Sequence, residues 1–194
     1  MNFPAVLQKV TVALDKAGAA YMLTGSFASA FYGVPRSTQD IDLVIAATPV
    51  QLRGFLGSLP STDYYVDVDA AVDAHHRESM FNLIDLGSGW KIDLMIRKSR
   101  PFSWEEFGRR RLVDVQGIPL YVASAEDIVI AKLEWAKLGK SQRQIEDAAG
   151  IVKIQGQLLD LAYLEKWIRE LDLHKEWVKA LGLTDDKLSS ERKD

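Results

Sequence analysis

Residues 25–42 read GSFASAFYGVPRSTQDID, and this stretch decides the fold of the 194-residue chain. It opens with Gly25-Ser26, directly after the apolar run Tyr21-Met-Leu-Thr24, which predicts a short buried strand. It ends in Asp40-Ile-Asp42, where alternation continues to Ile45 and predicts a second strand. The sequence therefore predicts one strand that runs into a helix at Gly25-Ser26, and a second strand that begins with two acids.

The two acids of the second strand share a face, because residues i and i+2 of a strand point to the same side. The carboxylates of Asp40 and Asp42 then lie side by side, and like charges this close repel each other. Mg²⁺ prefers oxygen ligands and keeps waters and substrate phosphates as its remaining ligands. The pair therefore predicts a seat for Mg²⁺, with Mn²⁺ as the alternative ion, although two solvated acids at a loop–strand junction would give the same pattern.

Gly25 and Ser26 stand at the predicted helix N-terminus. Free backbone N–H groups at such a terminus bind phosphate, and glycine permits close approach of the backbone. The Ser26 hydroxyl adds a donor. An ordinary N-cap serine explains the same two residues without a ligand.

A third acid follows in the run WKIDLMI, residues 90–96. Alternation predicts Ile92 and Leu94 on the core face and Asp93 on the other face. An acid within so apolar a strand needs a partner. Asp93 is therefore either a salt-bridged structural residue or a functional one, as a metal ligand or as the base that activates an attacking hydroxyl.

Together these parts resemble the DNA polymerase β-like nucleotidyltransferase superfamily, whose pattern is Gly-Ser, a gap, Asp-x-Asp and a distant Asp on a neighbouring strand. The run from Arg36 to Asp42 is similar to the Arg-x-Thr/Ser-x-Asp-x-Asp run of the AbiEii-like nucleotidyltransferases, the toxin components of some bacterial toxin–antitoxin pairs, and of small uncharacterised relatives. The likeness covers residues 20–45 and Asp93.

The resemblance implies an α/β (α+β) fold, with a nucleotidyltransferase-type mixed β-sheet, flanking helices and a C-terminal helical part. It implies Mg²⁺-dependent transfer of a nucleoside monophosphate from an NTP such as ATP to a hydroxyl of RNA (tRNA ends in particular), a protein or a small molecule. A toxin of this kind would also have a cognate antitoxin protein as a partner. Implied for catalysis and metal binding are Asp40, Asp42 and Asp93, and for the nucleotide Gly25, Ser26, Arg36 and Thr38.

A second likeness lies in the helical part, where AbiEii-like proteins carry a lysine, a later arginine and an aspartate beyond it. Lys132, Arg143 and Asp147 stand at matching spacing and are implied to bind nucleotide. Gly139 and Gln144 stand where an arginine and an aspartate are usual. These departures keep open the alternative of a catalytically inactive nucleotide- or partner-binding protein of the same fold. A further alternative is an antitoxin-like or structural interaction protein, which would be favoured if the chain's own side chains filled the cleft.

Three divisions follow from the change in pattern after Ser124: an α/β core over residues 1–123, a helical part over 124–183 and a flexible polar tail over 184–194. Net charge is −3 and there is no cysteine, so neither a disulfide nor a thiolate metal site can form. With no secretory signal and no apolar run long enough for a membrane span, we expect a cytoplasmic protein without a membrane partner.

The other expected elements follow from periodicity and turn residues. Helices are predicted over 3–16 and 49–57, and a short one reaches His75-His76. Strands are predicted at 64–68, and as hairpin pairs at 80–86 with 90–96 and 112–115 with 118–122. The tryptophans of the helical part, Trp135, Trp167 and Trp177, are predicted to pack between helices.

Overall fold

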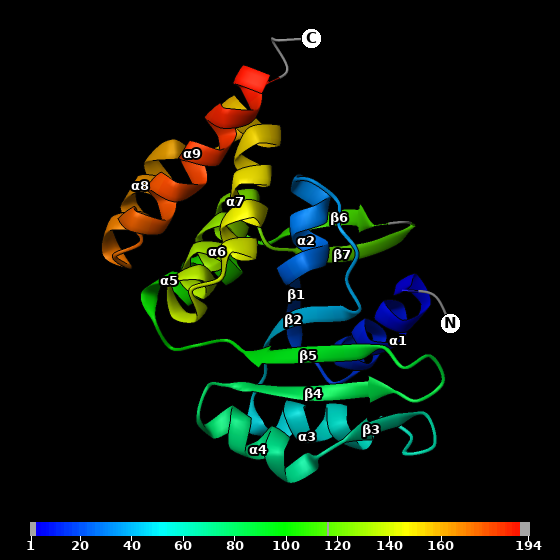
Figure 1. The fold of residues 1–194 in the computed structure, drawn as a ribbon. Coiled ribbons are helices and arrows are strands. Elements are labelled where there is room, and N and C mark those ends of the chain that lie inside the picture. Colours follow the sequence, from blue (N-terminus) through cyan, green and yellow to red (C-terminus); the bar gives the residue numbers. More distant parts are fainter. Residues whose placement is uncertain (1–2, 116, 191–194) are drawn as a thin grey trace. The chain divides into compact units, whose positions relative to one another are not determined.

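The computed structural model of the chain describes residues 3–115 and 117–190, with side chains described as far as Thr184 (Figure 1). The chain divides into two compact units. One comprises Met1–Phe27 and Ser37–Ala123, and the other comprises Ala28–Arg36 and Ser124–Asp194.

The first unit is built on a seven-stranded mixed sheet in the order β3-β4-β5-β2-β1-β7-β6 (Figure 1). β2 runs antiparallel to β1 but parallel to β5, and β1 runs parallel to β7. The strands are β1 (Ala20–Thr24), β2 (Asp40–Ala46), β3 (Tyr64–Val66), β4 (Met80–Asp85), β5 (Lys91–Ile96), β6 (Arg111–Val115) and β7 (Ile118–Val122). The predicted mixed sheet is confirmed.

Alternation places the core on one face of β2, where Ile41, Leu43 and Ile45 are fully buried. Four further helices belong to this unit: α1 (Phe3–Lys16), α3 (Pro49–Gly57), α4 (Val68–His76) and α5 (Pro101–Gly108). α1 contacts β1 and α3, and α4 contacts β4 and α3. The start of α3 is fixed by Thr48, whose side chain accepts from the Gln51 N–H while the Gln51 side chain accepts from the Thr48 N–H.

The second unit is helical, with α6 (Ala125–Gly139), α7 (Gln142–Gln155), α8 (Leu161–Glu170) and α9 (His174–Ser190), and a short 3₁₀ turn over Gly156–Leu158. Ser124 begins α6 as predicted, since its side chain accepts from the Asp127 N–H. The Asp127 carboxylate also accepts from the Tyr163 hydroxyl at 2.5 Å, which ties α6 to α8. α6 and α7 contact each other, and α9 contacts both of them.

Residues 28–36 belong with these helices although they lie between the two halves of the Gly-Ser…Asp-x-Asp motif. α2 (Gly25–Tyr32) begins in the sheet unit, and from Ala28 onward its residues are part of the helical unit. The Gln155 side chain donates to the Tyr32 carbonyl at 2.7 Å. A Cβ on Gly33 would meet Ile151 at 3.0 Å, so the backbone here lies directly against α7.

Several predicted boundaries are corrected by the structure. β3 ends at Val66, because the Asp67 side chain caps α4 and Val68 already belongs to that helix. α5 was not predicted, and α9 continues through Ser190, into the stretch assigned to a flexible tail. The turn residue Gln116 and residues 191–194 lie outside the described residues.

Among the tryptophans, Trp167 is buried as predicted, whereas Trp135 is 52% exposed, so its prediction as a core residue is wrong. Within residues 3–115 and 117–190, no helix is both long enough and apolar enough to cross a membrane.

Candidate active site

The helix that follows β1 begins against the carboxylate of Asp42. Thr24, the last residue of β1, is the register partner of Asp42 on β2. The Ser26 N–H donates to Asp42 Oδ2 at 3.3 Å. Gly25 has φ +64, and a Cβ there would lie 2.0 Å from Asp42 Oδ2. Only glycine therefore fits at position 25, for its backbone conformation and for the space that the carboxylate takes.

β2 and β5 bring the third predicted acid beside the first two. In the parallel register Asp42 is the partner of Asp93, and Asp40 is the partner of Lys91. Register partners on neighbouring strands point to the same side of the sheet. Asp40, Asp42 and Asp93 thus share the face opposite Ile41 and Leu43, as alternation predicted.

Asp93 is 7% exposed, and two side chains that the sequence analysis did not single out hold its carboxylate. Lys91 Nζ donates to Asp93 Oδ2 at 2.9 Å, and the Asn82 side-chain amide donates to Asp93 Oδ1. Alternation could have indicated Lys91, since it stands two residues before Asp93 on the same face. Asn82 comes from β4, and only strand pairing reveals it.

The Lys91 ammonium is the cation of this acidic face. Its hydrogen bond to Asp93 raises the pKa of Lys91 above its ordinary value, partial burial opposes that rise, and the charges of Asp93, Asp40 and Asp42 reinforce it. The ammonium therefore stays charged and offsets part of the repulsion among the three carboxylates.

The fit of a divalent ion to this face can be tested from its donors. Within the described ranges, no three carboxylate or imidazole side chains converge as a complete set of metal ligands. Asp42 and Asp93 are nevertheless register partners, and Asp40 lies on the same face. Because Mg²⁺ is commonly held by one or two carboxylates with waters and substrate phosphates, the donor set fits this ion.

The remaining predicted nucleotide-binding residues lie in different places. The Thr38 side chain accepts from the Asp40 N–H at 3.5 Å, so it supports the entry into β2. Arg36, Lys132 and Asp147 meet within the helical unit: Arg36 Nε lies 2.9 Å from Asp147 Oδ1, and Lys132 Nζ lies 2.7 Å from Asp147 Oδ2. Arg143 is exposed and does not join this cluster.

The Arg36–Asp147–Lys132 cluster is largely enclosed, with side-chain exposures of 5% for Lys132 and 8% for Asp147. Burial by itself would raise the pKa of Asp147, but the hydrogen bonds and charges of Arg36 and Lys132 outweigh it and hold that pKa below its ordinary value. The geometry thus gives all three residues a partner within their own unit.

Basic residues after β5 rest on aromatic rings. The Arg97 guanidinium lies 3.4 Å from the centroid of the Trp104 ring, and that of Arg110 lies 4.2 Å from the Phe107 centroid. Burial lowers the pKa of Arg97, and the nearby Arg110 charge adds to that effect. α5 supplies Trp104 and Phe107, so these arginines pack on the aromatic side chains of a helix.

Comparison with solved structures identifies the fold of the chain. An antigenic nucleotidyltransferase-like protein from Paracoccidioides brasiliensis superimposes with a TM-score of 0.51 at 20% identity, over 86% of this chain and 88% of that one. The fold is that of the nucleotidyltransferases. The antibiotic-resistance factor ANT(2'')-Ia is more distant, with a TM-score of 0.46 at 15% identity over 97% of this chain and 94% of that one. The sequence matches no family model and no curated protein.

Within this nucleotidyltransferase fold, the structure assembles Gly25, Ser26, Asp40, Asp42 and Asp93 in the sheet unit. It gathers Arg36, Lys132 and Asp147 in the helical unit. The predicted site residues thus include one cluster within each unit, and Arg143 joins neither of them.

Proposed function

We propose that this protein transfers a nucleoside monophosphate from an NTP to a hydroxyl acceptor, at the face formed by Asp40, Asp42 and Asp93. The observation that carries the proposal is the contact of Asp42 with the start of α2, where the Ser26 N–H meets Asp42 Oδ2 while Asp93 stands beside it in register. A helix N-terminus favours phosphate and carboxylates favour a cation, so an NTP with its ion suits both.

The chemistry is a single displacement at the α-phosphorus. The acceptor oxygen forms a new bond to that phosphorus, the bond to the bridging oxygen of the β-phosphate breaks, and pyrophosphate leaves. Asp93 accepts the proton of the acceptor hydroxyl. Gly25 and Ser26 lie against the β- and γ-phosphates, and the Ser26 hydroxyl is a donor to them, since the Ser26 N–H already donates to Asp42 Oδ2. The protein thus contributes mostly position and charge.

The ion would be held by Asp40 and Asp42; a place for Asp93 at a second metal position is the alternative to its role as proton acceptor. When bound, it supplies positive charge to the triphosphate during the displacement. In this proposal Lys91 is a positioning residue, because its Nζ contacts Asp93 at 2.9 Å and fixes the orientation of that carboxylate.

The test is incubation of the purified chain with Mg²⁺, each of the four NTPs labelled at the α-phosphate, and total RNA, protein extract or small-molecule hydroxyl acceptors in turn. Label should appear in one acceptor class, and Asp42→Asn should reduce it at least about a thousandfold, since removal of one charged group from such a site costs about 4 kcal/mol of transition-state stabilisation. Asp15→Asn, an exposed acid on α1, is the matched control and should retain full labelling.

Two outcomes would contradict the proposal. One is undiminished labelling by Asp42→Asn, and the other is the absence of any labelled acceptor while the wild-type chain still binds NTP in the presence of Mg²⁺. The second outcome would favour a protein that binds nucleotide without turnover.

That second candidate function has its own observation. Lys91 and Asn82 already hold both oxygens of Asp93, so the positive charge at the acidic face comes from the chain itself. Lys91→Met separates the two functions: a nucleotidyltransferase should retain or gain affinity for Mg²⁺, whereas a protein that binds nucleotide through Lys91 should lose NTP affinity.

A toxin role with an antitoxin partner rests on the likeness of the run from Arg36 to Asp42 to the AbiEii-like proteins. It predicts that induced expression arrests growth and that Asp42→Asn relieves the arrest. RNA, and tRNA ends in particular, is the acceptor we would test first on the same ground.

A further inference from the structure

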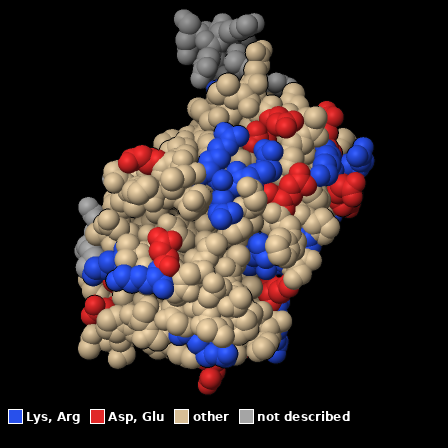
Figure 2. All heavy atoms as spheres, turned by 180° about the vertical axis from the view of Figure 1, so that it is seen from behind, with Lys and Arg blue, Asp and Glu red and all other residues tan. Residues whose placement is uncertain are grey.

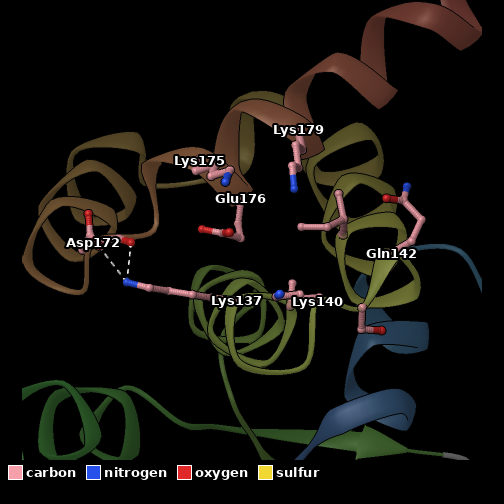
Figure 3. Close-up of a pocket in the computed structure, with 10 residues that line it drawn as sticks. Lys137, Lys140, Gln142, Asp172, Lys175, Glu176 and Lys179 are labelled. Atoms are coloured by element: carbon pink, nitrogen blue, oxygen red, sulfur yellow. Dashed lines mark hydrogen bonds and ion pairs between the residues drawn. The ribbon is translucent and has the colours of Figure 1, made fainter.

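A hollow of about 630 Å³ lies among α6, α7 and α9 in the helical unit, and Arg36, Lys132 and Asp147 are not among its lining residues (Figure 3). Its floor includes the buried side chains of Ala136 and Ile145. Lys137, Lys140, Lys175 and Lys179 line it, together with two acids, Asp172 and Glu176. A volume of this size suits a nucleotide-sized ligand.

One of the four lysines is already occupied. Lys137 Nζ donates to Asp172 Oδ2 at 2.9 Å and to the Asp172 carbonyl at 2.7 Å, and Figure 3 shows it extended toward Asp172. This pair closes the end of α8, because the carbonyls there lack helical partners. Apart from this pair, the charged residues of the lining are three lysines and one acid, Glu176.

Those three lysines lack an anionic partner among the side chains that the structure describes. Within residues 3–115 and 117–184, no ion pair or hydrogen bond engages the ammonium of Lys140, Lys175 or Lys179. Lys175 and Lys179 are four residues apart on α9, so they share a face and repel each other. On the face shown in Figure 2, lysines and arginines form several separate groups, with acidic residues beside them. An anion in the hollow would relieve the repulsion among the three lysines.

The N-terminus of α7 reaches the same hollow. Ser141 is its N-cap residue, and the Ser141 side chain makes no capping hydrogen bond. Ser141 and Gln142 both line the hollow. The first N–H groups of a helix have no partner within the helix and carry partial positive charge, which favours phosphate. The hydroxyl and these N–H groups add donors to the three ammonium groups.

Glu176 indicates which anions the hollow can bind. It is 9% exposed, it lines the hollow, and in the described part of the chain its carboxylate has no hydrogen-bond partner. Its place in the first turn of α9 suits the helix dipole. Its carboxylate faces the hollow, and a ligand hydroxyl would supply a donor to it.

We propose that this hollow is a binding site for a phosphorylated small molecule that carries hydroxyl groups, such as a nucleotide. Lys140, Lys175 and Lys179 contact the phosphates, the Ser141 end of α7 adds donors, and Glu176 accepts from a hydroxyl. All the residues that line the site belong to the helical unit, and the site needs no divalent ion.

The experiment is an amide NMR titration of the full ¹⁵N-labelled chain in EDTA, with ATP, inorganic tripolyphosphate and a short RNA as separate probes. ATP should shift the amides of Lys140–Gln142 and of Lys175 and Glu176 to saturation. The triple variant Lys140→Gln, Lys175→Gln, Lys179→Gln should weaken ATP binding by roughly 30-fold, because three charge-assisted contacts are lost.

The control is an equal loss of charge elsewhere. The triple variant Lys9→Gln, Lys16→Gln, Arg53→Gln removes three exposed cations of α1 and α3 and should leave ATP binding unchanged. Glu176→Met should abolish the preference for ATP over tripolyphosphate while tripolyphosphate binds at least as tightly as before. The mutant spectra also show whether each variant is folded.

Four outcomes would overturn the proposal: no saturable shifts at these amides, equal weakening by the control triple, equal affinity of the wild-type chain for ATP and tripolyphosphate, or shifts with RNA alone. None of them bears on transfer at the acidic face, which is measured with Mg²⁺ present and by labelling.

Discussion

The two clusters of charge in this protein have opposite composition. On the sheet, the ammonium of Lys91 feels the charges of three carboxylates, those of Asp40, Asp42 and Asp93. In the helical unit, one carboxylate, that of Asp147, is shared by the two cations Arg36 and Lys132. The acidic face has an excess of negative charge that an ion and a phosphate can complete, whereas the Asp147 cluster is complete in itself.

The difference indicates that the predicted site residues fall into a functional group, on the acidic face, and a structural group, in the Asp147 cluster. A side chain that catalyses a reaction or binds a ligand must keep some hydrogen-bonding or charge capacity for that ligand. A structural side chain can use all of its capacity within the protein. The acidic face is therefore the place to seek chemistry, and the Asp147 cluster is the place to seek stability. Substitutions in the acidic face and in the Asp147 cluster should therefore have different effects.

The largest effect should come from removal of the shared acid. Asp147→Ala leaves the enclosed ammonium of Lys132 without a counterion, so we expect a loss of about 3–5 kcal/mol in the free energy of unfolding. Urea denaturation measures it. Asp172→Ala breaks the exposed pair with Lys137 and is the control, with a far smaller change expected. Similar losses in the two variants would contradict a structural role for the Asp147 cluster.

A loss on the order of 3 kcal/mol should follow Gly25→Ala, because a left-handed backbone conformation and a clash with Asp42 add together. Gly89→Ala is matched for backbone: φ is +74 there, and a new Cβ would meet nothing within 4 Å. It should lose only about 1–2 kcal/mol. Thermal denaturation of both variants isolates the contribution of the carboxylate contact, and equal losses would show that it contributes nothing.

Acid should weaken the Asp147 cluster selectively. The pKa of Asp147 is lowered on folding, so its contribution is present above the unfolded value of about 3.9 and is lost as pH falls through the folded value. The stability difference between the wild-type chain and Asp147→Asn should thus be constant from neutral pH to about pH 4 and shrink below it. A difference that stays constant to pH 2 would contradict the lowered pKa.

The smallest effect has the opposite sign. Asp42→Asn removes one of two like charges that stand opposite each other, while its side-chain oxygen can still accept from the Ser26 N–H. Without divalent ions the variant should be more stable than the wild-type chain by roughly 0.2–1 kcal/mol. Added Mg²⁺ should raise the melting temperature of the wild-type chain and not that of the variant. Destabilisation by Asp42→Asn in EDTA would mean that the acidic face is already neutralised.

Local patterns predicted most of what lies in the sheet unit. The faces of β2 and β5 follow from alternation, whereas the position of Asp93 beside Asp42 was implied by the resemblance to the nucleotidyltransferases. α5 was missed because its eight residues contain only one turn of apolar spacing and are flanked by arginines. Periodicity over so short a segment cannot distinguish a helix from a loop.

Long-range contacts explain the other differences. Nothing local marks Arg36 as a partner of Asp147, 111 residues away, or places Asn82 against Asp93. Trp135 was expected between helices because tryptophan is usually buried, yet its position on α6 faces outward. Composition indicates what a residue prefers, while helix packing decides which face of the helix is covered.

The chain passes between the units at Phe27–Ala28, at Arg36–Ser37 and at Ala123–Ser124. A gene truncated after Ala123 would therefore encode residues 28–36 without α7, and Gly33, Tyr32 and Arg36 would lose Ile151, Gln155 and Asp147. A graft of the helical unit onto a related sheet would have to exchange residues 28–36 as well. Recombination in this fold is thus constrained to inherit the segment inside the motif together with the helices that follow it.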